Sequence, residues 1–430
     1  MATQNLSSAD AYLKNVYYGP WVEQLNQETA ILDVLEKTNA NDMGTFGGRQ
    51  LIFVAHSSRN RGRGGMTDGG NLATAGAQGG VDGLVSIKYF DVAIELSDQV
   101  IKQTKTDPMA FVRSLTFEME MAQKDMRKDV TRIAYGTGDG VLANYVSGGG
   151  VGPSVTMVVD SGQYIAVGDT VDILVKATGA SHGTGGVVQS VTFNGTANTA
   201  TQAQAQIVVL FPGAVTAQAA GDAVYISGDR SLESDGLRNI CSTGRTLHNI
   251  NSASAGNGFW DSNVKDYANA AAISEDGVMQ LAQQIRQRSG FAPKFGMSTL
   301  GVQRRLANTY TNDKRFNDNN ATDYKGGYDT IFVSAGGAPM PFRADVDAPC
   351  GTYFLLNEDG LCWSQIGPPD WLQPPDDKGS VFQLKSTATA GVWQRIWQAW
   401  LIWDACLVSI APARQGKGIN TYDDIPVQRL

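Results

Sequence analysis

The most constraining feature of this 430-residue chain is a long loop of glycine and arginine between two stretches with β-strand patterns. Residues 59–70, RNRGRGGMTDGG, contain three arginines and five glycines, and the segment continues to Gly80 with almost nothing to bury. The flanking residues 49–57 and 84–97 predict the two arms of one long hairpin. Because an isolated hairpin is only marginally stable in water, these arms must lie along another surface, which a second copy of the chain can supply.

The second predicted arm changes its apolar face between Tyr89 and Phe90. The apolar residues before that point have odd numbers, namely Val85, Ile87 and Tyr89. Those after it have even numbers, namely Phe90, Val92, Ile94 and Leu96. A one-residue change of phase turns every side chain to the other face of a strand. We therefore expect the two halves to pack on different surfaces, joined by a bulge. A strand buried on both faces is the alternative.

The residues after the hairpin predict the strongest helix of the chain. Asp107 and Pro108 are typical of a helix N-terminus, and Gly136 is typical of a stop. Between them, apolar residues recur at three- and four-residue steps: Val112, Leu115, Met119, Ala122, Met126, Val130 and Ile133. The pattern indicates about 28 residues, or about 42 Å of helix. Its many charged residues are interpreted as a solvated face with ion pairs.

Residues 147–230 have a different character, with short apolar runs separated by turn residues and almost no helical pattern. They predict a small β-barrel inserted into a larger domain. Helices return at 275–290, capped by Ser274, and at 299–310, where Ser298 is interpreted as the cap. A shorter helix is expected within 21–37. The last strand contains four tryptophans, which favour the middle of a sheet: Trp393, Trp397, Trp400 and Trp403.

Composition argues against several functional classes. The net charge of −8 is unlike that of a nucleic-acid-binding protein. Four dispersed cysteines without CxxC spacing are interpreted as reduced, buried thiols: Cys241, Cys350, Cys362 and Cys406. The three histidines are too scattered for a metal cluster. The N-terminus resembles no signal peptide, and the apolar residues 399–408 are too short for a membrane span. A cytosolic product is expected.

No motif in the sequence predicts catalytic, cofactor-binding or metal-binding residues. The glycines of GTGDG (136–140) lack the strand and helix of a dinucleotide site, and QGKGIN (415–420) lacks the hydroxyl residue of a phosphate loop. GMSTLG (296–301) spaces its glycines wrongly for a nucleophile elbow. The acidic stretch 318–329 has Asp323 where a calcium loop needs glycine. We therefore expect no enzyme activity.

The order of these pieces resembles the major capsid protein of tailed double-stranded-DNA bacteriophages, the Hong Kong 97-like fold. The stretch FDVAIELSDQVIKQTKTDPMAFVRSLTFEME looks like that family's junction between E-loop and spine helix. The resemblance implies an α+β chain with an N-terminal arm (1–43), an E-loop hairpin (44–103), a spine helix and the start of the peripheral domain (104–146), the inserted barrel (147–230), an axial domain (231–365) and the return strands of the peripheral domain (366–430).

The resemblance also implies a function and partners. It implies hexamers and pentamers that close into an icosahedral shell around double-stranded DNA, assembled in the host cytoplasm and found in the virion, with a portal partner. Some members of the family carry a longer N-terminal scaffolding segment, whereas about 40 residues precede the hairpin here. A separate scaffolding protein is therefore expected. The barrel either stabilises the subunit or projects outward to bind a neighbour or a decoration protein. The alternative is another β-rich phage protein, such as a tail tube or an adhesion module.

The hairpin supplies the predicted contact residues between subunits: Arg59, Arg61, Arg63, Tyr89, Phe90 and Val92. Glycines let a backbone follow a neighbour's surface, and arginines bind carboxylates there; a disordered linker is the alternative interpretation of the tip. Some members of the family crosslink an E-loop lysine to a neighbouring asparagine. Residues 59–85 contain no lysine, so no covalent crosslink of this kind is expected.

Overall fold

The computed structural model describes residues 29–35, 37–39, 45–46, 50–99, 114–194, 203–268, 271–309, 331–334, 339–373, 381–386 and 393–423. Most of the predicted N-terminal arm, the helix start at Asp107 and Pro108, and the stretch 318–329 lie outside the described residues. The chain divides into two compact units. The first contains Val92–Asp125 and Trp371–Leu401, and the second contains Glu28–Asp91, Met126–Asp370 and Ile402–Leu430.

A long strand, β22 (Trp393–Ser409), is central to one sheet, as its tryptophans predict. Along its length it pairs with β5 (Lys88–Ser97), β19 (Leu361–Gln365), β20 (Asp370–Trp371) and β21 (Gln383–Ser386), and β1 (Lys37–Asn39) joins β19 in parallel. Within the first unit, Ile94 of β5 and Ala399 of β22 are buried together with Ala122. Ion pairs of Lys385 with Glu95 and of Arg395 with Asp98 lie at this end of the sheet.

The helix predicted from apolar periodicity is α5 (Ser114–Ala134). Four residues of its predicted apolar face are buried: Ala122, Met126, Val130 and Ile133. The helix ends at Ala134, where the N–H of Gly136 donates to the Ile133 carbonyl at 2.9 Å. Gly138 and Gly140 then adopt φ of 81° and 80°, which turns the chain sharply into the next strand.

That next strand opens a closed barrel in the order β10-β7-β6-β11-β8-β9. The strands are β6 (Val141–Gly148), β7 (Gly152–Val159), β8 (Thr170–Val175), β9 (Ser181–Phe193), β10 (Ala205–Val215) and β11 (Asp222–Ile226). The barrel begins at Val141, ahead of the predicted start at residue 147. The reason is that Leu142 and Ala143 point into the barrel core, whereas the glycines at 148–150 form the first turn inside the barrel rather than its boundary.

A second sheet of the second unit has the order β14-β23-β18-β15-β17-β16. Its strands are β14 (Asn263–Asp266), β23 (Gly416–Ile419), β18 (Tyr353–Leu356), β15 (Phe295–Ser298), β17 (Pro339–Ala344) and β16 (Ile331–Ser334). Helices α7 (Glu275–Ser289) and α8 (Leu300–Thr309) share an apolar core with it.

The caps of these two helices differ in how well the sequence predicted them. Ser274 caps α7, accepting a hydrogen bond from the Gly277 N–H at 3.1 Å, as expected. The predicted cap Ser298 is instead the buried last residue of β15, and Thr299 caps α8 by accepting from the Val302 N–H at 3.3 Å. The sequence offers two adjacent hydroxyls, and the length of β15 decides between them.

The turn 345–348 connects several parts of the second unit. Asp345 accepts hydrogen bonds from the Tyr135 hydroxyl at 3.0 Å and from the Ile31 N–H at 3.1 Å, at the start of α2 (Ala30–Val34). Two barrel residues donate to the same turn: Gln163 to the Ala348 carbonyl at 2.7 Å and Tyr164 to the Asp347 carbonyl at 2.8 Å. The barrel is therefore joined to the end of α5 through one short turn.

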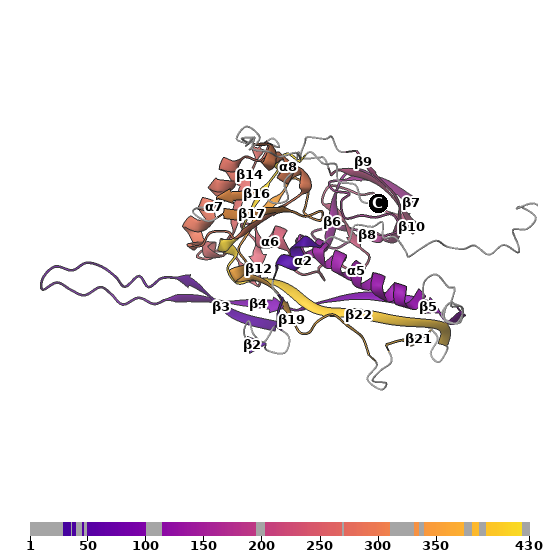
Figure 1. Cartoon of the computed structure of the whole chain (residues 1–430), viewed down its shortest axis with the longest axis horizontal. Coiled ribbons are helices and arrows are strands. Elements are labelled where there is room, and N and C mark those ends of the chain that lie inside the picture. Colours follow the sequence, from indigo (N-terminus) through magenta and orange to yellow (C-terminus); the bar gives the residue numbers. More distant parts are fainter. Residues whose placement is uncertain are drawn as a thin grey trace, which may run out of the picture. The chain divides into compact units, whose positions relative to one another are not determined.

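The predicted hairpin is present as a three-stranded sheet of β2 (Thr45–Phe46), β3 (Gln50–Ser58) and β4 (Gly79–Ser86). Gln50 lies opposite Ser86 and His56 opposite Gly80. Figure 1 shows β3 and β4 side by side, with residues 59–78 continuing beyond both strands.

The second arm corrects the sequence prediction in one respect. It ends at Ser86, and β5, starting at Lys88, belongs to the sheet of β22. The apolar pattern predicts that the two halves of this arm pack on different surfaces. The passage from one surface to the other occurs at Ile87, not between Tyr89 and Phe90.

Candidate interaction surface and its base

The tip of the hairpin, residues 59–78, forms hydrogen bonds only within itself among the described residues, apart from a bond between Gln78 and His56 at its edge. The Arg63 N–H donates to the Arg61 carbonyl at 2.8 Å, and the Gly62 N–H donates to the Asn60 side chain at 2.7 Å. The side chains of Arg59, Arg61 and Arg63 extend from this exposed segment, and no ion pair to them is found in the part of the chain that the structure describes. The tip thus presents three cations without an ion-pair partner among the described residues.

Two glycines let the two halves of the tip approach each other. A Cβ atom on Gly62 would lie 2.5 Å from the backbone nitrogen of Gly76, and one on Gly76 would lie 2.7 Å from the nitrogen of Gly62. Real Cβ atoms do not approach backbone this closely. These glycines therefore keep the tip narrow, which explains part of the glycine content without invoking disorder.

Apolar side chains also face outward along the hairpin. Val54 is 71% exposed and Leu72 is 82% exposed, and Ile52 and Met66 are exposed as well. On β3 the outward positions alternate with inward ones, so that Ile52 and Val54 share one open face. An apolar face beside three cations is typical of a surface that another protein covers.

The six predicted contact residues fall into two groups. The three arginines and Tyr89, which is 72% exposed, are open to solvent. Phe90 instead lies against Trp363 and Trp403, with ring centroids 6.5 and 6.1 Å away. Val92 packs against the apolar core of the first unit. The surface available to a partner is therefore carried by the arginines and Tyr89.

The base of the hairpin is fixed within the second unit. Leu51, Val85 and Ile87 are buried against Cys406 and Val408 of β22. The Leu84 N–H of β4 donates to the His248 carbonyl at 2.9 Å, and Lys88 donates to the Ser231 carbonyl at 2.9 Å. The expectation that residues 44–103 depend on another subunit stays a prediction for the tip, whereas the base packs on its own chain.

His248 connects the hairpin to β22. Its carbonyl accepts from β4, and its Nε2 accepts from the Ser409 N–H at 3.1 Å, which places the ring proton on Nδ1. Burial lowers the pKa of His248 to about 3, and the charge of Arg245 adds to the effect. The ring is therefore neutral at physiological pH, the only state in which its Nε2 accepts a hydrogen bond.

The backbone around His248 is a tight turn. His248 and Asn249 have φ of 51° and 64° between β12 (Thr246–Leu247) and β13 (Ile250–Asn251). Two consecutive positive φ values are the geometry of a two-residue hairpin turn, which Asn favours and His tolerates. This turn aims the His248 carbonyl at β4.

Phe53 of β3 completes the base. Its ring lies over Gly83, where a Cβ atom would be 2.4 Å away. It stacks on Trp260 with centroids 5.8 Å apart and meets the His248 ring edge-on at 6.0 Å. Only glycine at position 83 leaves room for this arrangement.

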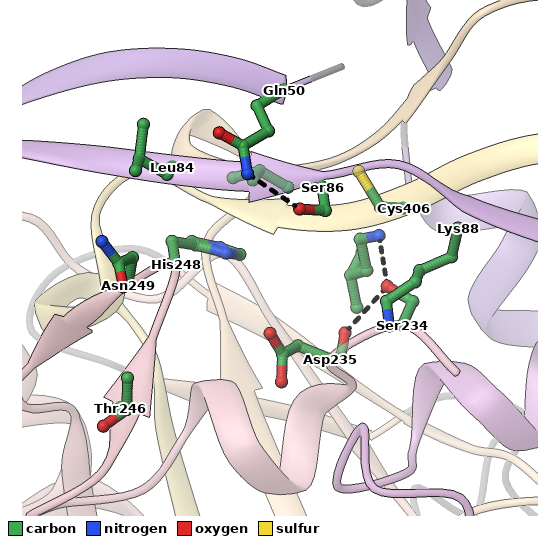
Figure 2. Close-up of a pocket in the computed structure, with 12 residues that line it drawn as sticks. Gln50, Leu84, Ser86, Lys88, Ser234, Asp235, Thr246, His248, Asn249 and Cys406 are labelled. Carbon is green, nitrogen blue, oxygen red and sulfur yellow. Dashed lines mark hydrogen bonds between the residues drawn. The ribbon is translucent and has the colours of Figure 1, made fainter. Parts of the chain in front are cut away.

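A cavity of about 420 Å³ lies beneath the hairpin base. Figure 2 shows Gln50, Leu84 and Ser86 of the hairpin on one side and Ser234, Asp235, Thr246 and His248 on the other. Its polar groups are mostly bonded within the chain: the Ser234 hydroxyl accepts from the Leu407 N–H at 2.9 Å, and Asn239 donates to Asp235. Burial raises the pKa of Asp235. Several polar side chains of this cavity are therefore held in place by the chain itself.

The described residues show no cluster of three or more His, Cys, Asp or Glu side chains that could hold a metal ion. Among those same residues, no helix is both long enough and apolar enough to cross a membrane. Cys241 and Cys406 are buried thiols, as the sequence predicts, whereas Cys350 and Cys362 are half-buried.

This chain is similar to known proteins in its fold and not in its sequence. No family profile matches the sequence, and neither does any curated protein. The capsid asymmetric unit of cyanophage A-1(L) matches with a TM-score of 0.59 at 13% identity, over 98% of this chain and 100% of that one. The capsid of a native GTA particle matches with a TM-score of 0.52 at 8% identity, over 98% of this chain and 100% of that one.

This chain has a phage major capsid protein fold. The likeness spans nearly the whole chain. Within that fold, the sequence predicted the hairpin and its exposed arginines but missed His248, Trp260 and Gly83 at the base. The one available signal was the pair His248–Asn249 between Leu247 and Ile250, a two-residue turn pattern.

Proposed function

We propose that this protein is the major capsid protein of a tailed phage. In this proposal it self-assembles into hexamers and pentamers that form an icosahedral head shell, enclosing double-stranded DNA without sequence-specific contacts and without enzymatic activity. The observation that carries the proposal is a hairpin whose base is fixed and whose tip is unsatisfied, in a chain with a capsid protein fold. The net charge of −8 agrees with a shell that encloses DNA rather than one that binds its sequence.

The hairpin supports assembly through two kinds of contact. The exposed arginines pair with carboxylates on the adjacent copy, since a guanidinium fork binds a carboxylate in two places. The outward Ile52, Val54 and Leu72 add apolar area beyond the about 800 Å² per partner of a standard interface. Because the base is already packed, docking has to order only the tip of the arm.

The wider setting follows from the same proposal. The protein is assembled in the host cytoplasm and resides in the virion, where it contacts a portal. A separate scaffolding protein guides its assembly, and a decoration protein is a further candidate partner. The domain boundaries inferred from the sequence are part of this proposal, with the barrel starting at Val141.

The test is assembly of a variant with the substitutions R59Q, R61Q and R63Q. We expect the wild-type protein to form closed shells or hexameric rings by negative-stain microscopy, and the variant to remain as free subunits. The matched control is T67A with N71A, which changes exposed residues of the same tip without changing its charge.

Three outcomes would contradict the proposal. Tubes formed by the wild-type protein would favour the tail-tube alternative, and discrete small particles alone would favour an adhesion module. Normal shells from the arginine variant would show that the tip is not the contact between copies.

A denaturing gel of mature particles should show one monomer band, because residues 59–85 offer no lysine for a crosslink.

A further inference from the structure

A second cavity, of about 380 Å³, lies between the barrel and the sheet that contains β23. The barrel side is lined by Asp160, Ser161, Gln163 and Tyr164, and the other side by Arg238 of α6 (Leu237–Ile240), Pro349–Thr352 and residues of the stretch 417–421. All of these residues belong to the second unit. The cavity is separate from the hairpin and takes no part in the proposed contact between copies.

Lys417 of β23 is the central cation of this cavity. Its Nζ donates to the Arg238 carbonyl at 2.8 Å and to the Ser242 hydroxyl at 2.7 Å. An ammonium group has three N–H donors, so one remains for a third acceptor. Burial lowers the pKa of Lys417 to about 8, and the charges of Arg238 and Arg245 act in the same direction.

The charges around Lys417 are not balanced by acids of the cavity lining. Arg238 is exposed at the mouth, and no ion pair to its side chain is found among the described residues. Among the described residues of the lining, the one acidic residue is Asp160, whose two oxygens accept from the Asn144 N–H at 2.7 Å and from the Asn144 amide at 2.6 Å. The lining therefore holds two cations against one carboxylate that is already bonded within the barrel.

Thr421 supplies an independent observation. Its residue is fully buried in the lining, and its hydroxyl has no hydrogen-bond partner in the described part of the chain. A buried hydroxyl without a partner costs about 1–3 kcal/mol. A group that arrives with acceptor oxygens removes that cost and meets the two cations at the same time.

We propose that this cavity binds a small oxyanion, a phosphate or a carboxylate. Lys417 provides its remaining N–H, Arg238 closes the mouth with its guanidinium, and the Thr421 hydroxyl donates to the same anion. Charge-assisted hydrogen bonds of this kind are about twice as strong as neutral ones. The bound anion neutralises the cation cluster next to the barrel, so that the junction between barrel and sheet is more stable when the cavity is occupied.

The experiment measures inorganic phosphate and acetate separately on the full-length subunit. Thermal unfolding is followed as each anion is raised to about 10 mM, a range that detects millimolar affinity, with chloride at matched ionic strength as the reference. The variants are R238Q, at an exposed position, and T421V, which removes only the orphaned hydroxyl. Acetylation of Lys417 by a limiting reagent, read by mass spectrometry, gives a readout that does not depend on stability.

We expect a saturable rise in the unfolding temperature with the oxyanion and not with chloride, and slower acetylation of Lys417. R238Q and T421V should each weaken the apparent affinity by about tenfold. The relative response to phosphate and acetate identifies which oxyanion fits. The proposal is overturned by a response equal to that of chloride, or by one that both variants retain in full. Either result leaves the assembly proposal untouched, because it does not involve the hairpin.

Discussion

The barrel and the β3–β4 hairpin are both antiparallel sheets, yet they solve the problem of strand edges in opposite ways. Every barrel strand has two hydrogen-bonded neighbours, and the inward side chains form one buried core. The hairpin sheet has no strand beyond β2 and β4 among the described residues, and its tip bonds almost entirely to itself there. An exposed strand edge is a template for pairing with another chain. The barrel therefore has no free strand edge with which to pair, whereas the hairpin sheet keeps such edges.

The comparison teaches that strand content alone does not separate a self-sufficient part from a dependent one. What separates them is where the apolar residues point. In the barrel, Val155, Met157 and Val159 alternate inward around a shared core. In the hairpin, Leu51 and Phe53 point inward at the base, whereas Ile52 and Val54 point outward and are exposed.

The largest expected effect contrasts the barrel core with the hairpin tip. Ile207 is fully buried in the barrel, so I207A should lower the free energy of unfolding by about 4 kcal/mol. L72A removes a comparable side chain from the tip, where it is 82% exposed, and should change stability by less than about 0.5 kcal/mol. Hydrogen-exchange mass spectrometry of residues 205–215 during urea denaturation gives both values. Equal losses would break the comparison.

Acid should destabilise the hairpin base more than the barrel. The pKa of His248 is about 3 in the folded chain against 6.5 ordinarily, so between these values the unfolded chain takes up a proton that the folded chain excludes. Stability is therefore lost as the pH falls, by about 3 kcal/mol at about pH 4. The amide of Leu84 should exchange faster at that pH in the wild type than in H248N, measured at equal temperature.

The control for this prediction is H56N, which changes an exposed histidine of the same hairpin. H56N should keep the acid sensitivity of the wild type. If H248N and the wild type lose stability equally on acidification, the loss arises elsewhere in the chain, and His248 is not the acid-sensitive link of the base.

Replacing a glycine by alanine should have a smaller effect on stability, and the effect should differ between the base and the tip. A methyl group on Gly83 would collide with the Phe53 ring and push it away from Trp260, so G83A should cost about 2 kcal/mol. A methyl group on Gly65 would meet no atom of the described chain within 4 Å, so G65A should be close to neutral. Thermal unfolding of the two variants measures the difference. A costly G65A would show that the tip is more constrained than its contacts indicate.

The smallest change in stability is expected from the arginine substitutions in the tip. Measuring it distinguishes an effect on stability from an effect on assembly. The triple variant R59Q, R61Q and R63Q should change the unfolding free energy of the free subunit by less than about 0.5 kcal/mol, because these side chains have no ion-pair partners among the described residues. Thermal unfolding of unassembled protein checks this. A large destabilisation would mean that a failure to assemble reflects misfolding rather than a lost contact.

Much of the fold could be predicted because local pattern and burial agree. The three- and four-residue spacing of Ala122, Met126, Val130 and Ile133 indicated a helix, and these residues are buried on α5. The parity change in the second arm indicated two surfaces, and two sheets are present. The break was misplaced because Ile87 is itself buried beneath the hairpin, which continued the apolar pattern past the end of β4.

The base of the hairpin could not be predicted because its contacts are distant in sequence. His248 accepts from Ser409, 161 residues away, and no local propensity reports such a pairing. Gly83 was one of 49 glycines, and only the position of Phe53 across the strand pair makes it necessary. The cation excess near Lys417 likewise arises only when β23 and α6 are brought together.

Closure of the barrel has a practical consequence for engineering. Its first turn, between β6 and β7, carries Val151, which is 76% exposed, beside Gly150, around which there is open space. A foreign peptide inserted there meets no free sheet edge with which to mispair. The turn is therefore a natural position for epitope display, where added sequence faces solvent while the hairpin remains unaltered.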